Sequence, residues 1–265
     1  MDRLDALINR SIYLIREAYA RHRKMAMLWS IGKDSTTLLW LCMKAFGGRL
    51  PFPVLHIDTS YKFPQIYEFR DRVAAEWGLD LLIARNQHAL GSGMCNTRKL
   101  DCCTALKTIA LQDAIVEHCF EALLLGIRRD EHGVRAKERY FSPRDLDFKW
   151  NYADQPMELW DQYHSRVTAG RHYRVHPLLH WTELDIWSVI GREKIPMVDL
   201  YFARDGKRYR SIGCECCCSP IDSQASTVDE IIQELRTTRL AERAGRAQDK
   251  EDAEVMQKLR ALGYM

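Results

Sequence analysis

A loop suited to binding phosphate lies near the N-terminus of the chain. Its polar and glycine residues are, in order, Ser30, Gly32, Lys33, Asp34, Ser35 and Thr36. The loop follows the apolar run Met25–Trp29 and precedes an apolar-rich stretch that predicts a helix. A glycine lets backbone N–H groups approach an anion, and the N-terminus of a helix adds donors and partial positive charge. We therefore predict phosphate binding; the alternative is that Asp34 or Ser35 only caps the helix.

A second candidate segment, Gly126–Arg139, holds five cationic residues. The planar guanidinium of arginine suits phosphate and sulfate oxygens. Transfer at the α-phosphate of a nucleotide places negative charge on the attacking and leaving groups, and fixed cations lower that barrier. Together with Lys33, the cations expected to contact these oxygens are Arg128, Arg129, Arg135 and Lys137. The alternative is a solvated, salt-bridged surface, which is common for a run of charges.

Two further residues stand at the ends of apolar runs. Asp58 follows the run Pro53–Ile57, and Gly126 closes the run that begins at Ala122. We expect Asp58 to hold Mg²⁺ or to orient a ribose, because a bare triphosphate usually needs a divalent ion. The alternative for Asp58 is a cap of the next turn. Both residues are included in the predicted nucleotide-binding set.

Strands and helices alternate along the first half of the chain. Short apolar runs predict strands at 25–29, 53–57, 79–84 and 122–126, and periodic apolar positions predict helices at 3–24, 36–45, 63–77 and 105–117. This alternation predicts an α/β fold, a parallel sheet with helices on both faces. Ligands bind such sheets at the carboxyl ends of the strands, where the phosphate loop and the arginine segment both stand.

The pattern changes from about residue 146. Aromatic residues, proline and histidine dominate 148–181, a helix is predicted at 183–192, and 227–260 has a charged, helical pattern. We therefore divide the chain into a nucleotide-binding domain at 1–226 and a helical C-terminal appendage at 227–265.

Composition narrows the classes of function. The chain has 265 residues and a formal net charge of +3, which is too small to indicate nucleic-acid binding by itself. No apolar run approaches about 18 residues, and the N-terminus has no secretory pattern, so we expect neither a membrane span nor export. Nine cysteines, seven of them in two patches, are typical of metal binding or redox chemistry in the cytosol. The expected location is the cytoplasm.

The two cysteine patches lie far apart in the sequence. An adjacent pair and a C-x-x-C pair provide four thiols that can converge on one site: Cys102, Cys103, Cys214 and Cys217. Four thiolates are the ligand set of a [4Fe–4S] cluster or a tetrahedral zinc ion, and we favour the cluster. The same patches hold alternative ligands, Cys95, Cys216 and Cys218. The opposing interpretation is a set of buried, inert thiols.

Several blocks of the chain resemble one family. The phosphate loop resembles the PP-loop of the ATP pyrophosphatase superfamily, with Ile31 where many members have a second glycine. The blocks similar to the small subunit of bacterial sulfate adenylyltransferase are 51–59, 68–72, 128–131, 135–139, 181–187, 195–196, 200–203 and 263–264. The resemblance implies an adenine nucleotide α-hydrolase-like sheet, adenylyl transfer from ATP to sulfate with release of pyrophosphate, and a GTPase large subunit as partner. Whether the chain forms a homo-oligomer stays open.

The cysteines depart from that family. The segments 211–217 and 95–100 are similar to cysteine motifs of iron–sulfur sulfonucleotide reductases. This similarity gives two alternatives: a reductase of adenylyl sulfate or phosphoadenylyl sulfate, and a thiolation enzyme that adenylates its acceptor. Only the second implies a nucleic acid as partner. Those reductases attack with a cysteine on a C-terminal tail, and this chain has no cysteine after Cys218, which favours adenylyl transfer.

Overall fold

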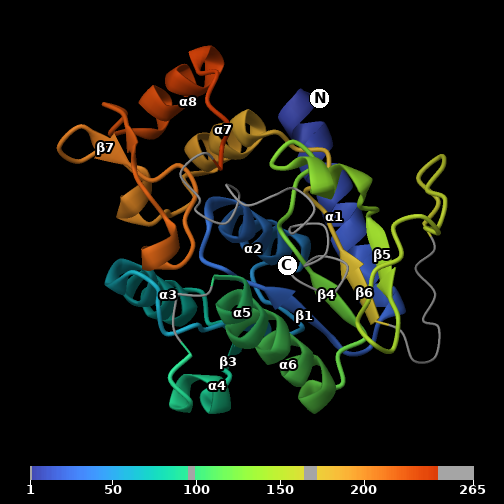
Figure 1. Cartoon of the computed structure of the whole chain (residues 1–265). Coiled ribbons are helices and arrows are strands. Elements are labelled where there is room, and N and C mark those ends of the chain that lie inside the picture. Colours follow the sequence, from blue (N-terminus) through green and yellow to red (C-terminus); the bar gives the residue numbers. More distant parts are fainter. Residues whose placement is uncertain (1, 95–98, 164–171, 244–265) are drawn as a thin grey trace.

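The centre of the molecule is a six-stranded sheet with the strand order β3-β2-β1-β4-β6-β5 (Figure 1). The structure is a computed structural model and describes residues 2–94, 99–163 and 172–243. The strands are β1 (Met25–Leu28), β2 (Val54–Ile57), β3 (Leu81–Ala84), β4 (Ala122–Leu124), β5 (Phe141–Arg144) and β6 (His172–Val175). Neighbouring strands are parallel except at one edge, where β5 pairs with β6 in the antiparallel sense. The parallel sheet predicted from the sequence is confirmed, with one antiparallel edge strand added.

Helices surround this sheet (Figure 1). The α-helices are α1 (Arg3–Arg21), α2 (Lys33–Ala45), α3 (Pro64–Glu76), α4 (Gln87–Gly91), α5 (Lys99–Cys103), α6 (Ala110–His118), α7 (Glu183–Glu193) and α8 (Val228–Thr237). A π-helical turn, η1 (Thr104–Ile109), joins α5 to α6, and short 3₁₀ turns are η2 (Gly133–Lys137), η3 (Asp199–Tyr201) and η4 (Glu215–Cys217). A separate two-stranded ribbon pairs β7 (Lys207–Arg208) with β8 (Ile221–Asp222).

Each face of the sheet has its own hydrophobic core, because successive side chains of a strand point to opposite faces. Met27 and Leu124 belong to one core, with buried residues of α1, α2, α3 and α7. Their chain neighbours Ala26 and Leu123 belong to the other core, with buried residues of α6. The prediction of helices on both faces is therefore confirmed.

Two regions differ from the sequence-based expectation. The stretch 148–181, for which the sequence predicted no strand, contains β6, whose strand pattern is hidden because the buried residues His172 and Arg174 are polar. The helix expected at 227–260 ends at Thr237 within the described part of the chain, and Thr238 has an extended backbone. Two adjacent β-branched threonines favour that ending. The division into a domain at 1–226 and an appendage at 227–265 stays a prediction. Ile231 of α8 is buried in the core that also contains residues of α2 and α7.

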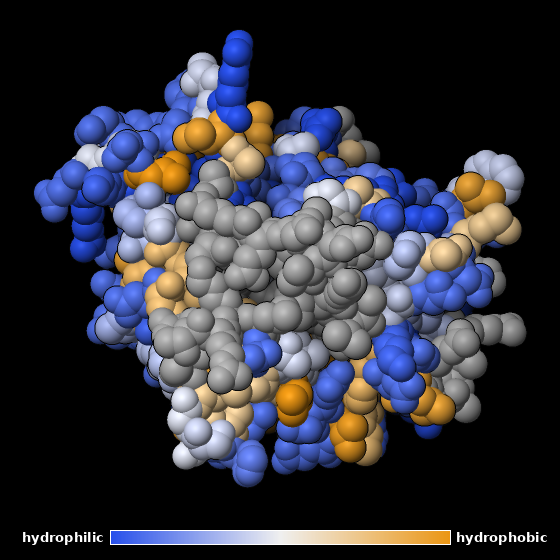
Figure 2. Space-filling model, in the orientation of Figure 1, coloured by the Kyte–Doolittle hydropathy of each residue, from blue (hydrophilic) through white to orange (hydrophobic). Residues whose placement is uncertain are grey.

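Hydrophilic residues predominate on the face seen in Figure 2, and hydrophobic residues are scattered among them. The largest exposed apolar side chains include Trp160, which is 88% exposed, and Met157, on the long connection that follows β5. Within the described ranges, no helix combines the length and the apolar character needed to cross a membrane.

Candidate active site

The candidate site lies at the carboxyl ends of β1 and β4. The chain runs outward from β1 to β2 and β3 and then returns to β4 on the other side of β1. This reversal opens a crevice between the loops that follow β1 and β4. A pocket lies in the crevice, and the cations in its described lining are Lys33, Lys62, Lys107, Arg135 and Arg243. The acids of the lining are Asp34 and Glu131, so the pocket is suited to an anion.

The predicted phosphate loop forms one wall of this pocket. Gly32 precedes α2 and gives its N-terminus no side-chain cap, which leaves room for an anion near the helix N–H groups. The backbone N–H of Lys33 donates to the hydroxyl of Tyr201 at 2.8 Å. The hydroxyls of Ser30 and Ser35 share a hydrogen bond of 3.0 Å across the loop. These contacts give the loop a fixed shape before any ligand binds.

The backbone of the loop is held tightly between buried neighbours. Ile31 is buried and has a φ of 66°, a left-handed conformation that is costly for a β-branched residue. Thr36 is buried as well, and its hydroxyl accepts a hydrogen bond from the indole of Trp29 at 3.1 Å. A Cβ on Gly126 would lie 2.9 Å from the backbone nitrogen of Ser35, so only glycine lets the end of β4 approach α2 this closely.

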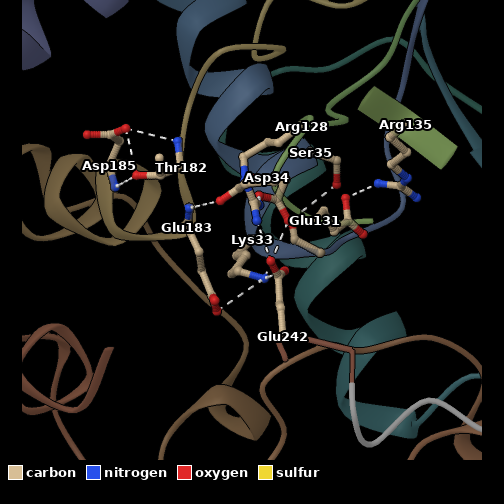
Figure 3. Close-up of polar contacts among 12 residues, drawn as sticks. Lys33, Asp34, Ser35, Arg128, Glu131, Arg135, Thr182, Glu183, Asp185 and Glu242 are labelled. Carbon is tan, nitrogen blue, oxygen red and sulfur yellow. Dashed lines mark hydrogen bonds and ion pairs between the residues drawn. The ribbon is translucent and has the colours of Figure 1, made fainter. Parts of the chain in front are cut away.

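Two buried cations of the site are neutralised by carboxylates (Figure 3). The Nζ atom of Lys33 lies 3.5 Å from Asp34 and 3.8 Å from Glu183, and it contacts Glu242. The guanidinium of Arg128 contacts the carboxylates of both Asp34 and Glu242. A buried charge is tolerated only when it is paired in this way.

Pairing also shifts the ionisation of these groups. Burial alone opposes the charge on Glu242, yet the charges of Lys33 and Arg128 hold the pKa of its carboxyl below the usual range. Arg128 is fully buried and lies 2.9 Å from Asp130, and its pKa is raised by the surrounding carboxylates despite burial. The structure therefore places Arg128 behind the pocket, where it orients acidic side chains.

A second charged group lies at the pocket rim. The carboxylate of Glu131 accepts from Arg135 and, at 2.8 Å, from Arg243. Arg135 belongs to the predicted arginine segment and lines the pocket. Arg243 comes from the segment after α8, so the C-terminal region of the described chain reaches the site.

Arg129 and Lys137, also predicted to contact the oxyanion, lie outside the described lining of this pocket. Arg129 contacts the ring of His180 and donates to the carbonyl of Glu138 at 3.1 Å. The ammonium of Lys137 lies 4.6 Å from the centre of the Tyr152 ring. Arg128 and Arg129, although neighbours in the chain, therefore have different partners: Arg128 contacts Asp34 and Glu242, whereas Arg129 contacts His180 and Glu138.

Asp58 is buried and is not among the described lining residues of the pocket. Its carboxylate accepts from the backbone of Ser60 at 2.7 Å, from the hydroxyl of Tyr67 at 2.9 Å and from Arg85. Burial opposes its ionisation, but these donors lower the pKa of Asp58 overall. In this arrangement Asp58 fixes the loop after β2.

Sequence reasoning did not select several residues that the fold brings to the site. They are Lys62, Lys107, Tyr201, Glu242 and Arg243. Tyr201 stood within a family block, which was a usable signal. Lys107 lies in the π-helical turn, a type of irregularity frequent at functional sites, but an apolar helical pattern concealed it.

The fold also brings the two cysteine patches together. Burial and the neighbouring thiols of Cys103, Cys214 and Cys216 raise the pKa of Cys102 to about 11. The sulfurs of Cys216 and Cys217 lie 3.7 Å apart. In the part of the chain that the structure describes, no group of three or more ligand-type residues is arranged to hold a metal ion. Cys95 lies outside the described residues.

Comparison with known proteins agrees with this geometry. The Phosphoadenosine phosphosulfate reductase domain family matches residues 24–220. The sulfate adenylyltransferase subunit 2 of Saccharophagus degradans is 40% identical over 289 residues, which cover 96% of this chain and 94% of that protein. The protein of the same name from Nocardia farcinica is 42% identical, over 96% of this chain and 93% of its own.

Solved structures share the fold. The FMN adenylyltransferase of Candida glabrata in complex with ATP aligns with a TM-score of 0.59 and 18% identity, over 99% of this chain and 83% of that chain. At this identity the likeness concerns the fold alone. The extent of the sequence similarity decides the family: the chain belongs to the sulfate adenylyltransferase subunit 2 family, within the wider PAPS reductase domain family.

Proposed function

We propose that this chain is a nucleotidyltransferase that transfers the adenylyl group of ATP to sulfate and releases pyrophosphate. The observation that carries the proposal is the pocket at the strand ends, which is lined by five cations and by the first residues of α2, whose N-cap residue Gly32 has no side chain to cap the helix. Family membership adds support, because relatives that cover almost the whole chain are named sulfate adenylyltransferase subunit 2.

The reaction needs positioning rather than a protein nucleophile. A sulfate oxygen attacks the α-phosphorus, the bond from that phosphorus to the bridging oxygen of the β-phosphate breaks, and pyrophosphate leaves with the electron pair. The N-terminus of α2, with Lys33, is suited to the leaving pyrophosphate. Arg135 and Lys107 line the pocket, and we assign them contacts with the oxygens that gain charge. Gly126, Ser30 and Ser35 set the width of the crevice.

Mg²⁺ is part of this proposal as the ion that accompanies ATP. The described acids nearest the pocket, Asp34 and Glu131, are paired with arginines, and Asp58 already accepts three hydrogen bonds. The phosphate oxygens themselves are therefore the expected main ligands of the ion. When bound, the ion would neutralise charge on the triphosphate.

A matched pair of arginine variants tests the proposed reaction. The assay is sulfate-dependent exchange of labelled pyrophosphate into ATP, with adenylyl sulfate identified by chromatography. Arg135→Ala removes a pocket cation and is expected to lower exchange by about a hundredfold. Arg139→Ala removes a cation outside the described lining and is expected to retain exchange. A wild-type protein that binds ATP but forms no adenylyl sulfate would contradict the choice of acceptor.

Two further assays test the two alternatives. A reductase would convert added adenylyl sulfate, or its 3′-phosphorylated form, to sulfite when supplied with a thiol reductant. A thiolation enzyme would release pyrophosphate only with its own acceptor, a nucleic acid included. The relatives' designation as subunit 2 supports a second subunit, for which we propose a GTPase. The cytoplasm is the proposed location.

We further propose that the converging thiols bind a metal centre, with a [4Fe–4S] cluster preferred to zinc. The proposed ligands are Cys102, Cys103, Cys214 and Cys217, with Cys95, Cys216 and Cys218 as alternates. The described thiols are close together but not arranged around a common centre, so this site would have to reorganise on binding. No step of adenylyl transfer is assigned to it.

Anaerobic purification followed by iron and sulfide analysis tests the metal proposal. Wild-type protein is expected to be brown with about four irons per chain. The Cys102→Ser/Cys214→Ser double variant is expected to lose the iron, whereas Cys119→Ser, an exposed thiol at the end of α6, is expected to keep it. Colourless wild-type protein that contains neither iron nor sulfide would contradict the proposed cluster.

A further inference from the structure

The carboxylate of Glu242 bridges the two buried cations of the site (Figure 3). One oxygen contacts the ammonium of Lys33 and the other contacts the guanidinium of Arg128. The side chain of Glu242 is only 6% exposed. It reaches this position from the segment 238–243 that follows α8, 209 residues along the chain from Lys33.

A carboxylate held between a lysine and an arginine resembles a phosphate group, because both are anions that accept charge-assisted hydrogen bonds through oxygens. We propose that the carboxylate of Glu242 is an internal competitor, a group of the protein itself that competes with the phosphates of ATP for the same cations. This inference rests on the proposed ATP chemistry. The Glu242 carboxylate takes up the contacts of Lys33, which lines the pocket, and of Arg128, which lies behind the pocket. It leaves when the pyrophosphate end of ATP binds Lys33. The position of the segment 238–243 would thereby depend on whether the phosphates of ATP occupy the pocket.

Electrostatics favours the departure of one anion when a phosphate arrives. Lys33 and Arg128 already contact the carboxylates of both Asp34 and Glu242. A phosphate would be a third negative group on this pair of cations, and the repulsion among the three grows in a medium of low dielectric constant. The ammonium of Lys33 already lies near Asp34 and Glu183 as well as Glu242. Exchange of the Glu242 carboxylate for a phosphate keeps Lys33 and Arg128 paired, so neither cation is left buried without a partner.

Glu242 is the carboxylate best able to move. Asp34 belongs to the first turn of α2, and Glu183 begins α7, where it accepts hydrogen bonds of 2.7–3.2 Å from Arg210. The segment that carries Glu242 has no helix or strand. One tether is the hydrogen bond of 2.8 Å from Arg210 to the carbonyl of Leu240.

The segment also carries a cation next to the competing anion. Arg243 lines the pocket and donates to Glu131 at 2.8 Å. Withdrawal of Glu242 therefore repositions Arg243, which can then contact the bound nucleotide or leave Glu131 to Arg135 alone. In either case a binding event at the phosphate loop is transmitted to the C-terminal segment.

Charge removal at Glu242 tests the proposal. The Kd for an ATP analogue with a methylene between its α- and β-phosphates is measured by calorimetry for wild type, Glu242→Gln and Glu117→Gln. Glu117 is an exposed acid of α6 and serves as the control. If the open form is about a tenth of the ligand-free population, Glu242→Gln binds about tenfold more tightly, and the control is unchanged. Equal or weaker binding by Glu242→Gln would mean that Glu242 is a fixed positioning residue and would overturn the proposal.

Hydrogen exchange on the wild-type protein gives a second test that needs no variant. Saturating inorganic pyrophosphate is expected to increase amide exchange in residues 238–243, and unchanged or slower exchange there rejects displacement. Pyrophosphate also separates this proposal from the proposed reaction. Suppose that Glu242→Gln binds pyrophosphate more tightly than the wild type, but that the wild type forms no adenylyl sulfate. This result would support the competitor role of Glu242 and reject the proposed reaction. If neither protein binds pyrophosphate, the competitor is rejected.

Discussion

Substitution of Gly126 by alanine tests the contact that sets the width of the crevice. An alanine Cβ would lie 2.9 Å from the backbone nitrogen of Ser35 and 3.0 Å from the carbonyl group of Asp34. Ordinary contacts begin at 3.4 Å, so the first turn of α2 must retreat by about half an ångström. The obstructing atoms are backbone atoms, which cannot rotate away as a flexible side chain can.

This retreat has a stability cost and a catalytic cost. Overpacking of this kind typically lowers the free energy of unfolding by about 1–3 kcal/mol. A misplacement of about 1 Å can reduce a rate by about a hundredfold, so half that shift of the phosphate loop is expected to reduce kcat/KM for ATP by about tenfold. Urea unfolding measures the first effect, and pyrophosphate–ATP exchange measures the second.

The control is Gly91→Ala at the end of α4. A Cβ there meets nothing within 4 Å, and the backbone is not in the left-handed region. This variant is expected to be neutral or slightly stabilising, by up to about 1 kcal/mol, with unchanged exchange. If Gly126→Ala has the stability and the kcat/KM of the wild type, the close approach of Gly126 to the first turn of α2 is refuted. Lost stability with full activity would instead separate the phosphate loop from catalysis.

Two further outcomes follow from the buried charges. Lys33→Ala is expected to lower the free energy of unfolding by about 3–5 kcal/mol, because the Glu242 carboxylate loses one of its two cations. Adding Glu242→Ala should restore stability in urea unfolding but not exchange activity, and failure to restore it would argue against the pair. Burial and nearby Lys62 lower the pKa of His56 to about 4, so the unfolded chain binds a proton below about pH 6.5 before the folded protein does. Stability should fall by up to about 1.4 kcal/mol per pH unit from pH 6.5 towards 4, and unfolding titrations of His56→Gln should show a smaller slope; an equal slope would exclude His56 as the source.

Local patterns predicted most of the fold. The apolar run that becomes β1 and the polar loop before α2 are adjacent in the chain, so composition and periodicity were sufficient to place them. Strand β6 was not predicted, because buried Arg174 gives it a polar composition. The π-helical turn was not predicted either, since its residues also fit an α-helical pattern.

The sequence by itself determined the phosphate loop, the parallel sheet and the family, because these depend on contiguous residues. Tertiary structure decided which charged side chains meet in the pocket. It gave Arg128 the carboxylates of Asp34 and Glu242 as partners and Arg129 the ring of His180, although the two arginines are chain neighbours. It also brought Glu242 to Lys33 across 209 positions. Such a contact leaves no periodic signal in one sequence, since it arises only when helices and strands pack and buried charges find partners.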